Sequence, residues 1–162
     1  MPTTPANKAM ELTNESRRLA GLRRREEALA ASEQATGIYG QLAESQPDIY
    51  RPHLAASLNN QSLRLVDLER REEALAAVEQ AVTIRRQLAE SLPDTYRPRL
   101  AASLDNLADT LSSLNRDAEA SAIREEANAA RSGDGHSGKE PGRRTAHWPL
   151  QVFRRKSAPG LP

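Results

Sequence analysis

The chain has 162 residues, of which 38% are hydrophobic and 28% charged, with a formal net charge of +1 and no cysteine. This length fits one domain, and the near-neutral charge provides no overall field that would attract nucleic acid or acidic substrates. The lack of cysteine excludes disulfides and thiolate metal sites. No apolar run reaches the ~18 residues of a membrane span, and residues 1–15 contain no apolar stretch typical of a secretory signal. We therefore expect a cytoplasmic protein.

The first residues precede a weakly repeated segment. Residues 1–6 are predicted to be a disordered N-terminus. From residue 7 the sequence resembles a later part of itself, since residues 14–16 align with residues 60–62. We interpret this segment as a partial first unit of a repeat.

Two complete copies of the repeat follow. Residues 25–70 and 71–116 align without gaps at an offset of 46 residues, and 30 of the 46 positions are identical. A partial later copy covers residues 117–131. A fixed period of this size is typical of stacked repeat arrays, in which each unit buries its apolar face against its neighbours. Residues 7–131 are therefore predicted to form one helical repeat array.

Each complete unit is predicted to contain two helices. Apolar and small residues recur at steps of three and four, as one face of a helix requires. Pro52 fits the first turn of the first helix, and Pro93 prevents continuation of the second. We expect a first helix of roughly 15 residues, a turn near Glu69, a second helix of roughly 20 residues and a connector over residues 92–98. The apolar and small positions of the middle copy are Leu54, Ala55, Leu58, Ser62, Leu65, Leu68, Ala74, Leu75, Val78, Ala81, Val82, Ile84 and Leu88.

The turn between the two helices carries a different residue in each copy. Asn115 stands where the first helix of the last copy must stop, and asparagine tolerates left-handed backbone angles. Arg23 and Glu69 occupy the same place in the earlier copies. We expect these two residues to be strained there by roughly 1 kcal/mol relative to glycine.

The pattern of small and apolar positions resembles the tetratricopeptide repeat (TPR). It is most similar to the longer version found in kinesin-light-chain-like arrays and bacterial multi-repeat proteins. The small residues Ser62, Ala74 and Ala81 match places where helices of this family approach closely. The period of 46 exceeds the usual 34 and also fits HEAT or armadillo arrays, but the Ala74/Ala81 spacing favours TPR. The resemblance implies an all-α, right-handed α-solenoid of antiparallel helix pairs with about three repeats.

The two ends of this array differ from its middle. Arg124 replaces the apolar residue found at Val78, so we interpret the last helix as a terminal cap. In the first unit, Glu15 stands where the last copy has the apolar Leu107, and Ser32 stands where the middle copy has the apolar Val78. Three helix pairs are about the minimum for an independent array, so we expect modest stability and allow for homo-oligomers.

The resemblance also implies a binding groove. In TPR arrays the first helix of each pair lines the concave face, where a peptide or protein segment binds. Because an amide both donates and accepts hydrogen bonds, the recurring asparagines could hold an extended peptide, or they could bond only to a neighbouring helix. Arg17 at one end and the two aspartates at the other would polarise the groove. The implied groove residues are Thr13, Asn14, Arg17, Asn59, Asn60, Leu63, Asp105, Asn106 and Asp109.

No motif indicates catalysis, a metal site or a cofactor. His53 lies near a connector, and its counterpart in the next copy is Arg99. The sequence contains no nucleophile motif and no glycine-rich phosphate loop. The carboxylate clamp by which some TPR proteins grip chaperone tails is not reproduced, because Ala102 and Asn106 stand where basic residues would be expected.

Residues 132–162 differ in composition from the rest of the chain. They carry 6 Lys and Arg against 2 Asp and Glu, whereas residues 1–131 carry 17 against 20. Their Gly and Pro content predicts a disordered basic tail. Residues 147–153 hold the only Trp and the only Phe. We favour a tail without a function over a docking segment for the chain's own groove, and both over electrostatic attachment to nucleic acid or anionic lipid.

The sequence therefore predicts an adaptor that binds a protein or peptide in the groove of a helical repeat array. The alternative is a structural or self-associating remnant of a larger repeat-containing signalling protein. On either interpretation we do not expect nucleic acid as a partner.

Overall fold

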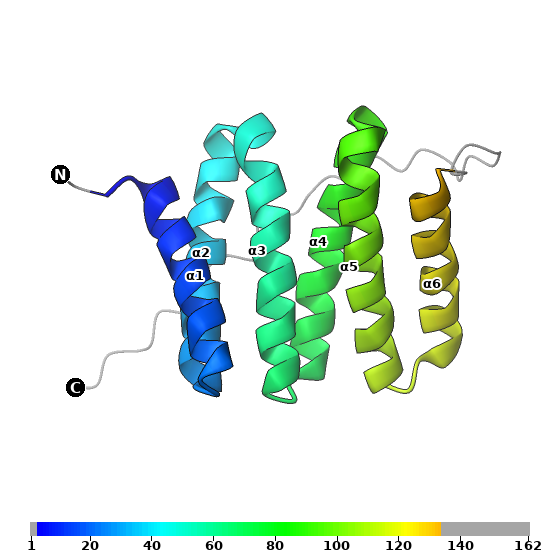
Figure 1. Ribbon diagram of the computed structural model, residues 1–162, viewed down its shortest axis with the longest axis horizontal. Coiled ribbons are helices and arrows are strands. Elements are labelled where there is room, and N and C mark those ends of the chain that lie inside the picture. The colour runs from blue at the N-terminus through cyan, green and yellow to red at the C-terminus, as the bar shows by residue number, and fades with distance from the viewer. Residues whose placement is uncertain (1–2, 134–162) are drawn as a thin grey trace, which may run out of the picture.

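The computed structural model describes residues 3–133 as a row of six helices, with no strand in that range (Figure 1). Each helix packs against the next one in the chain, and α3 also touches α5. This arrangement confirms the all-α solenoid of helix pairs. The predictions made for the basic tail fall largely on residues 134–162, outside the described residues. The helices are α1 (Pro5–Gly21), α2 (Arg25–Ser45), α3 (Pro47–Asp67), α4 (Arg71–Ser91), α5 (Pro93–Ser113) and α6 (Asp117–Ser132).

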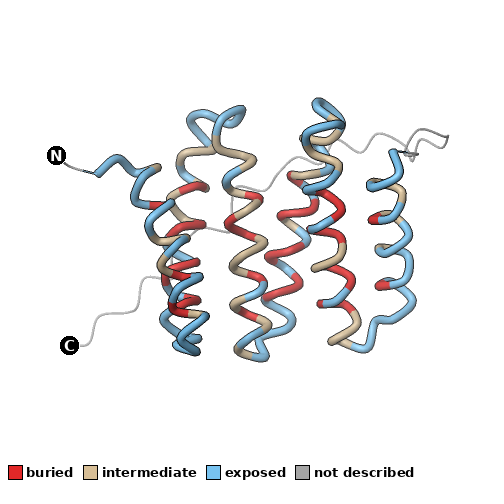
Figure 2. The backbone as a smooth tube through the Cα atoms, in the orientation of Figure 1, coloured by how far each residue is buried: buried red, intermediate tan, exposed pale blue. Residues whose placement is uncertain are grey.

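The first helices of the three pairs, α1, α3 and α5, form one layer, and α2 and α4 lie behind it (Figure 1). We call the surface formed by α1, α3 and α5 the first-helix face, and the surface formed by α2, α4 and α6 the second-helix face. Helix α1 begins at Pro5, two residues before the start expected for the array. Buried residues concentrate where the helices face one another (Figure 2).

The expected helix boundaries were wrong for the first helix of each pair. Helices α3 and α5 have 21 residues each and begin at Pro47 and Pro93. Residues 93–98 are therefore the first turns of α5, and the joint between α4 and α5 is Leu92 alone, with φ −136° and ψ 73°. Proline is compatible with the first helical position, because that N–H has no partner within the helix. The period of 46 residues is therefore long because both helices of a pair have 21 residues. The expected connector over residues 92–98 does not contribute to it, since most of it is helical.

Pro52 and Pro98 lie inside α3 and α5, not at the first turn as predicted. Each removes one backbone N–H at the second turn, where a lost hydrogen bond disturbs fewer neighbours than in the middle of a helix. The sequence reasoning treated each proline as a boundary, although only the first proline of each pair marks one.

The turns within the pairs adopt the expected left-handed backbone. Arg23, Glu69 and Asn115 have φ of 59°, 60° and 59°. In each turn the next amide closes the helix end, as when the Arg70 N–H donates to the Leu65 carbonyl at 2.9 Å. Three equivalent turns therefore carry one favourable residue and two strained ones.

We expect Glu69→Asn to raise the free energy of unfolding by about 0.5–1 kcal/mol, because asparagine tolerates left-handed angles better than glutamate. The reverse change at the equivalent turn, Asn115→Glu, should lower it by a similar amount. Urea unfolding followed by circular dichroism measures both. Equal midpoints for the two variants would contradict the assignment of strain to these turns.

The apolar core is largest at the C-terminal end of the array. There α4, α5 and α6 share one cluster that includes Val78, Val82, Leu104 and Leu107. The α2/α3 region is more polar, since Ser32 is buried at 2% exposure and the Thr36 and Ser57 hydroxyls are 2.9 Å apart. This polarity agrees with the predicted degeneracy of the first unit.

Both ends of the array carry polar residues where another copy of the repeat is apolar. On α6, Ser121, Arg124 and Asn128 occupy the positions that Leu75, Val78 and Val82 hold on α4. Arg124 is exposed and forms an ion pair with Asp109 of α5 at 3.3 Å. On α1, Glu15 takes the place of the buried Leu107 and pairs with Arg18 at 2.6 Å. These substitutions disfavour stacking of another apolar helix on either end.

Candidate protein-binding face

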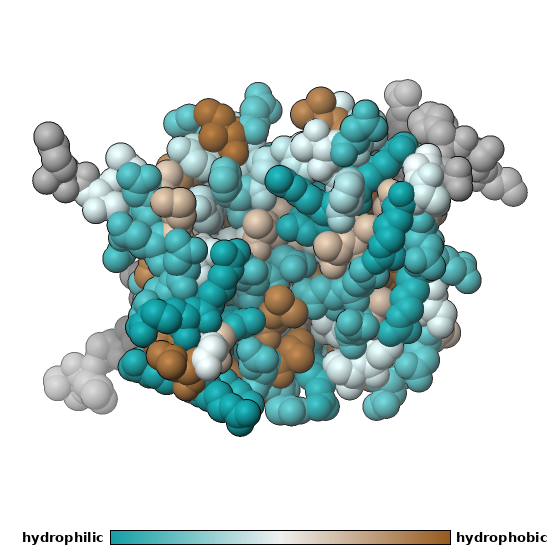
Figure 3. All heavy atoms as spheres, in the orientation of Figure 1, coloured by the Kyte–Doolittle hydropathy of each residue, from teal (hydrophilic) through white to brown (hydrophobic). Residues whose placement is uncertain are grey.

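The nine predicted groove residues all lie on α1, α3 and α5, at positions related by the repeat. These helices form one layer, whose outer face is mostly hydrophilic (Figure 1 and Figure 3). Asn14, Arg17, Leu63 and Asp109 are exposed, and Leu63 is 38% exposed. Thr13, Asn59, Asn60, Asp105 and Asn106 are half-buried.

A polar bridge joins α3 to α5 and uses two of the predicted asparagines. The Asn106 amide donates to the Asn59 Oδ1 at 3.2 Å and to the Ser62 Oγ at 2.9 Å. The Ser103 hydroxyl donates to the same Asn59 oxygen at 3.1 Å. The structural alternative, a hydrogen bond to the adjacent helix, therefore accounts for Asn59 and Asn106.

The other two recurring asparagines, Asn14 and Asn60, are not part of this bridge. Asn14 is exposed on α1, and Asn60 is half-buried on α3. Within residues 3–133 neither side chain has a hydrogen-bond partner, whereas Thr13 donates to the Ala9 carbonyl at 2.8 Å. Asn14 and Asn60 are therefore the amides best placed to meet a ligand.

The acidic end of the predicted groove is largely neutralised. Asp105 and Asp109 pair with Arg131 and Arg124, which both come from α6. These two arginines reach back to α5 because α6 is the last helix of the described array. The polarity expected between Arg17 and the two aspartates is correspondingly weaker than the sequence suggested.

Sequence reasoning missed Arg85 on α4. Its Nη1 donates to the Arg99 carbonyl oxygen and to the Ser103 Oγ, both at 2.6 Å. The side chain is half-buried, and burial lowers its pKa, with repulsion from Arg99 as a second cause. In the preceding repeat the equivalent pair is Tyr39 and His53, whose rings stack at 5.4 Å. The signal in the sequence was this paired change from two aromatic rings to two arginines.

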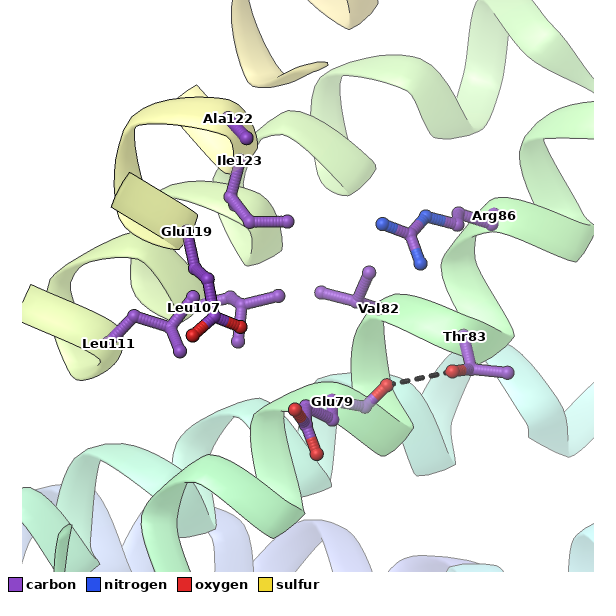
Figure 4. A pocket seen from close by; sticks show the side chains of 9 residues that line it. All are labelled: Glu79, Val82, Thr83, Arg86, Leu107, Leu111, Glu119, Ala122 and Ile123. Carbon is purple, nitrogen blue, oxygen red and sulfur yellow. Dashed lines mark hydrogen bonds between the residues drawn. The ribbon is translucent and has the colours of Figure 1, made fainter. Parts of the chain in front are cut away.

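The second-helix face contains a hollow of about 510 Å³ between α4 and α6. In Figure 4, Val82 and Ile123 point into it from opposite sides, with Leu107 of α5 at its base. A second hollow of about 390 Å³ continues toward the Pro93 end of α5. The Arg86–Glu126 ion pair, at 2.7 Å, stands between the two. The hollows are therefore shallow and crossed by charge.

Across residues 3–133, no cluster of acidic and histidine side chains has the spacing of a metal site. None of the six helices combines the length and the apolar character that a membrane crossing needs.

Comparison with known proteins identifies the repeat. The family model described as tetratricopeptide repeat matches residues 54–94 and 100–127. The chain contains tetratricopeptide repeats. The two matched segments cover the α3/α4 and α5/α6 pairs, which confirms the predicted family and removes the HEAT and armadillo alternatives. Proteins with TPR repeats generally act as non-catalytic scaffolds for protein–protein interaction.

A solved TPR structure has the same fold. The crystal structure of BtubC (BKLC) from P. vanneervenii superposes with a TM-score of 0.67 at 19% sequence identity. The alignment covers 85% of this chain and 52% of BtubC, so this chain spans about half the length of that protein. This likeness establishes the fold alone. No curated protein sequence matches the chain.

Proposed function

We propose that this TPR array is an adaptor module that holds a peptide or protein segment on its first-helix face. The observation that carries the proposal is the exposure of Arg17 and Leu63 at equivalent positions of α1 and α3, with Asn14 exposed one turn before Arg17. TPR arrays generally serve protein–protein interaction, which supports a protein as the partner.

The chemistry of this face suits an extended segment. The Asn14 and Asn60 amides can each donate to and accept from a peptide backbone without selecting its sequence. Leu63 adds an apolar contact on the same side of α3, one turn beyond Asn60. The bridge made by Asn59 and Asn106 holds α3 and α5 at a fixed separation, so less conformational entropy is lost when a ligand spans them.

Leu63→Asp is expected to lower affinity for the partner at least about tenfold, a loss of ~1.4 kcal/mol. This change copies Asp109, the residue that the next repeat carries at the same position, so the fold should tolerate it. Asn60→Ala should weaken binding in the same direction. Crosslinking and pull-down from the native cell, followed by titration with the purified partner, provide the measurement.

The matched control is Ala122→Arg, which fills the hollow between α4 and α6 and lies near Glu119 and Glu126. We expect it to leave binding unchanged. Loss of binding in this variant with retention in Leu63→Asp would move the docking site to the second-helix face.

Self-association remains the second candidate function. The charged ends of the array, with Glu15 on α1 and Arg124 on α6, weigh against end-to-end stacking. Light scattering over a range of concentrations separates the two candidates, because an adaptor of the proposed kind needs no second copy.

A further inference from the structure

We propose that Arg85 and Arg99 form an anion site at the α4/α5 junction that binds a carboxylate of an acidic side chain in the docked segment. The inference rests on the proposed function, because it assumes a peptide on the first-helix face. It adds the chemical class of that peptide and the residues that recognise it.

The orientation of Arg85 leaves the Nε/Nη2 edge of its guanidinium without a hydrogen-bond partner in the described residues. The two N–H groups of Nη1 are directed at the Arg99 carbonyl and the Ser103 hydroxyl, both 2.6 Å away. A guanidinium has five N–H donors, so the Nε–H and the two Nη2–H donors remain. Within residues 3–133 the hydrogen bonds of Arg85 are the two made by Nη1, and none uses these three donors. The Nε/Nη2 edge is a fork that a carboxylate can meet with two parallel hydrogen bonds.

The charge on Arg85 has no counterion in the described part of the chain. Seven other arginines on or beside the second helices are paired with glutamate or aspartate: Arg24, Arg70, Arg71, Arg86, Arg116, Arg124 and Arg131. Arg85 instead bonds only to neutral oxygens while half-buried next to Arg99, and its pKa is lowered by burial. An anion placed there would relieve both the desolvation and the repulsion.

The site is continuous with the first-helix face. The Ser103 hydroxyl that accepts from Arg85 donates to Asn59, which in turn accepts from Asn106. Arg99 lies two turns before Asn106 on the same side of α5, and its side chain is exposed, 5.8 Å from the Tyr96 ring. A peptide that crosses α3 and α5 would therefore pass within reach of both arginines.

The chain itself offers few competing carboxylates. Asp105 and Asp109, the two acids of the predicted groove, are already paired with α6 arginines. Residues 134–162 contain only two acidic residues against six basic ones, so they are a poor source of a counterion. We therefore assign the site to an acidic segment of a partner.

The test is a titration of the full chain with a capped tetraglutamate peptide, followed through the Arg85 Nε–Hε resonance by nuclear magnetic resonance. We expect a saturable shift of this resonance, and none with tetralysine. The variant Arg85→Tyr/Arg99→His installs the pair found in the preceding copy of the repeat, Tyr39 and His53, and should bind tetraglutamate at least about tenfold more weakly. The converse variant, Tyr39→Arg/His53→Arg, should add a second equivalent of bound peptide.

Circular dichroism of both double variants confirms that loss or gain of binding is not loss of fold. Unchanged tetraglutamate affinity in Arg85→Tyr/Arg99→His overturns the proposal, and so does sulfate that binds as tightly as the peptide. If Leu63→Asp abolishes binding of the native partner and Arg85→Tyr/Arg99→His leaves it intact, the docking face stands and the anion site is wrong. If neither variant affects the native partner, the proposed function fails as well.

Discussion

Val78→Arg is expected to lower the free energy of unfolding by about 4 kcal/mol or more, enough to unfold much of the array. Val78 is fully buried, at 0% exposure, in the cluster shared by α4, α5 and α6. An arginine there would bring an unpaired charge into a cluster that also contains Leu100, Leu104 and Leu107. Burial of a charge without a partner is among the most destabilising single changes.

The chain provides its own control for this prediction. Arg124 occupies the same repeat position on α6, where it is exposed and pairs with Asp109 at 3.3 Å. Arg124→Val should therefore change stability by less than about 1 kcal/mol, since exposed ion pairs contribute little. Urea unfolding measures both variants. A small effect of Val78→Arg would mean that α4 is not covered by α5, contrary to the described stacking.

Leu104→Ala should lower the free energy of unfolding by about 3–4 kcal/mol, and the loss should shrink at the equivalent leucines toward the N-terminus. Leu104 is at 0% exposure in the largest cluster, and Leu58 is at 4% in a smaller one with Ala81 and Ile84. Leu12 on α1 is only half-buried, beside the cluster of Leu19 and Ala28. We expect Leu58→Ala to cost about 2–3 kcal/mol and Leu12→Ala about 1 kcal/mol.

This series makes the same leucine-to-alanine substitution at three equivalent positions of the repeat. It therefore tests whether the apolar core is larger toward the C-terminal end of the array. The graded loss follows from the number of helices that surround each leucine, because the cost of a truncation depends on how tightly the cavity is enclosed. Three equal values from urea unfolding would contradict a core that grows toward α6. A larger loss of stability at Leu12 than at Leu104 would mean that the core grows toward α1 instead.

Much of the fold could be predicted because the sequence contains two complete copies of the same helix pair. The 46-residue offset, the helical spacing of positions such as Ala74 and Ala81, and the left-handed turn at Asn115 were all readable from the sequence. The helix starts at Pro47 and Pro93 were not, since proline is equally compatible with a loop and with the first turn of a helix. The residues next to each proline in the sequence do not show whether it lies in a loop or begins a helix.

The candidate site was predictable only in part. Repeat alignment placed the groove residues on the first helices, but it could not show how their polar groups are used. Asn59 and Asn106 bond to each other, and the two aspartates are paired by arginines of α6. These contacts connect residues 15 to 47 positions apart, beyond the reach of a periodicity argument. Arg85 escaped notice because the position it occupies is not on a first helix.

The central claim is that the partner docks on the first-helix face. The chain has no cysteine, so a single introduced thiol is the only one available for a photo-crosslinker. Leu63→Cys on α3 and Ala122→Cys on α6 place benzophenone maleimide on opposite helix layers, at positions that are both exposed. We expect the native partner to be crosslinked from position 63 and not from position 122. Crosslinking from position 122 alone would contradict the account.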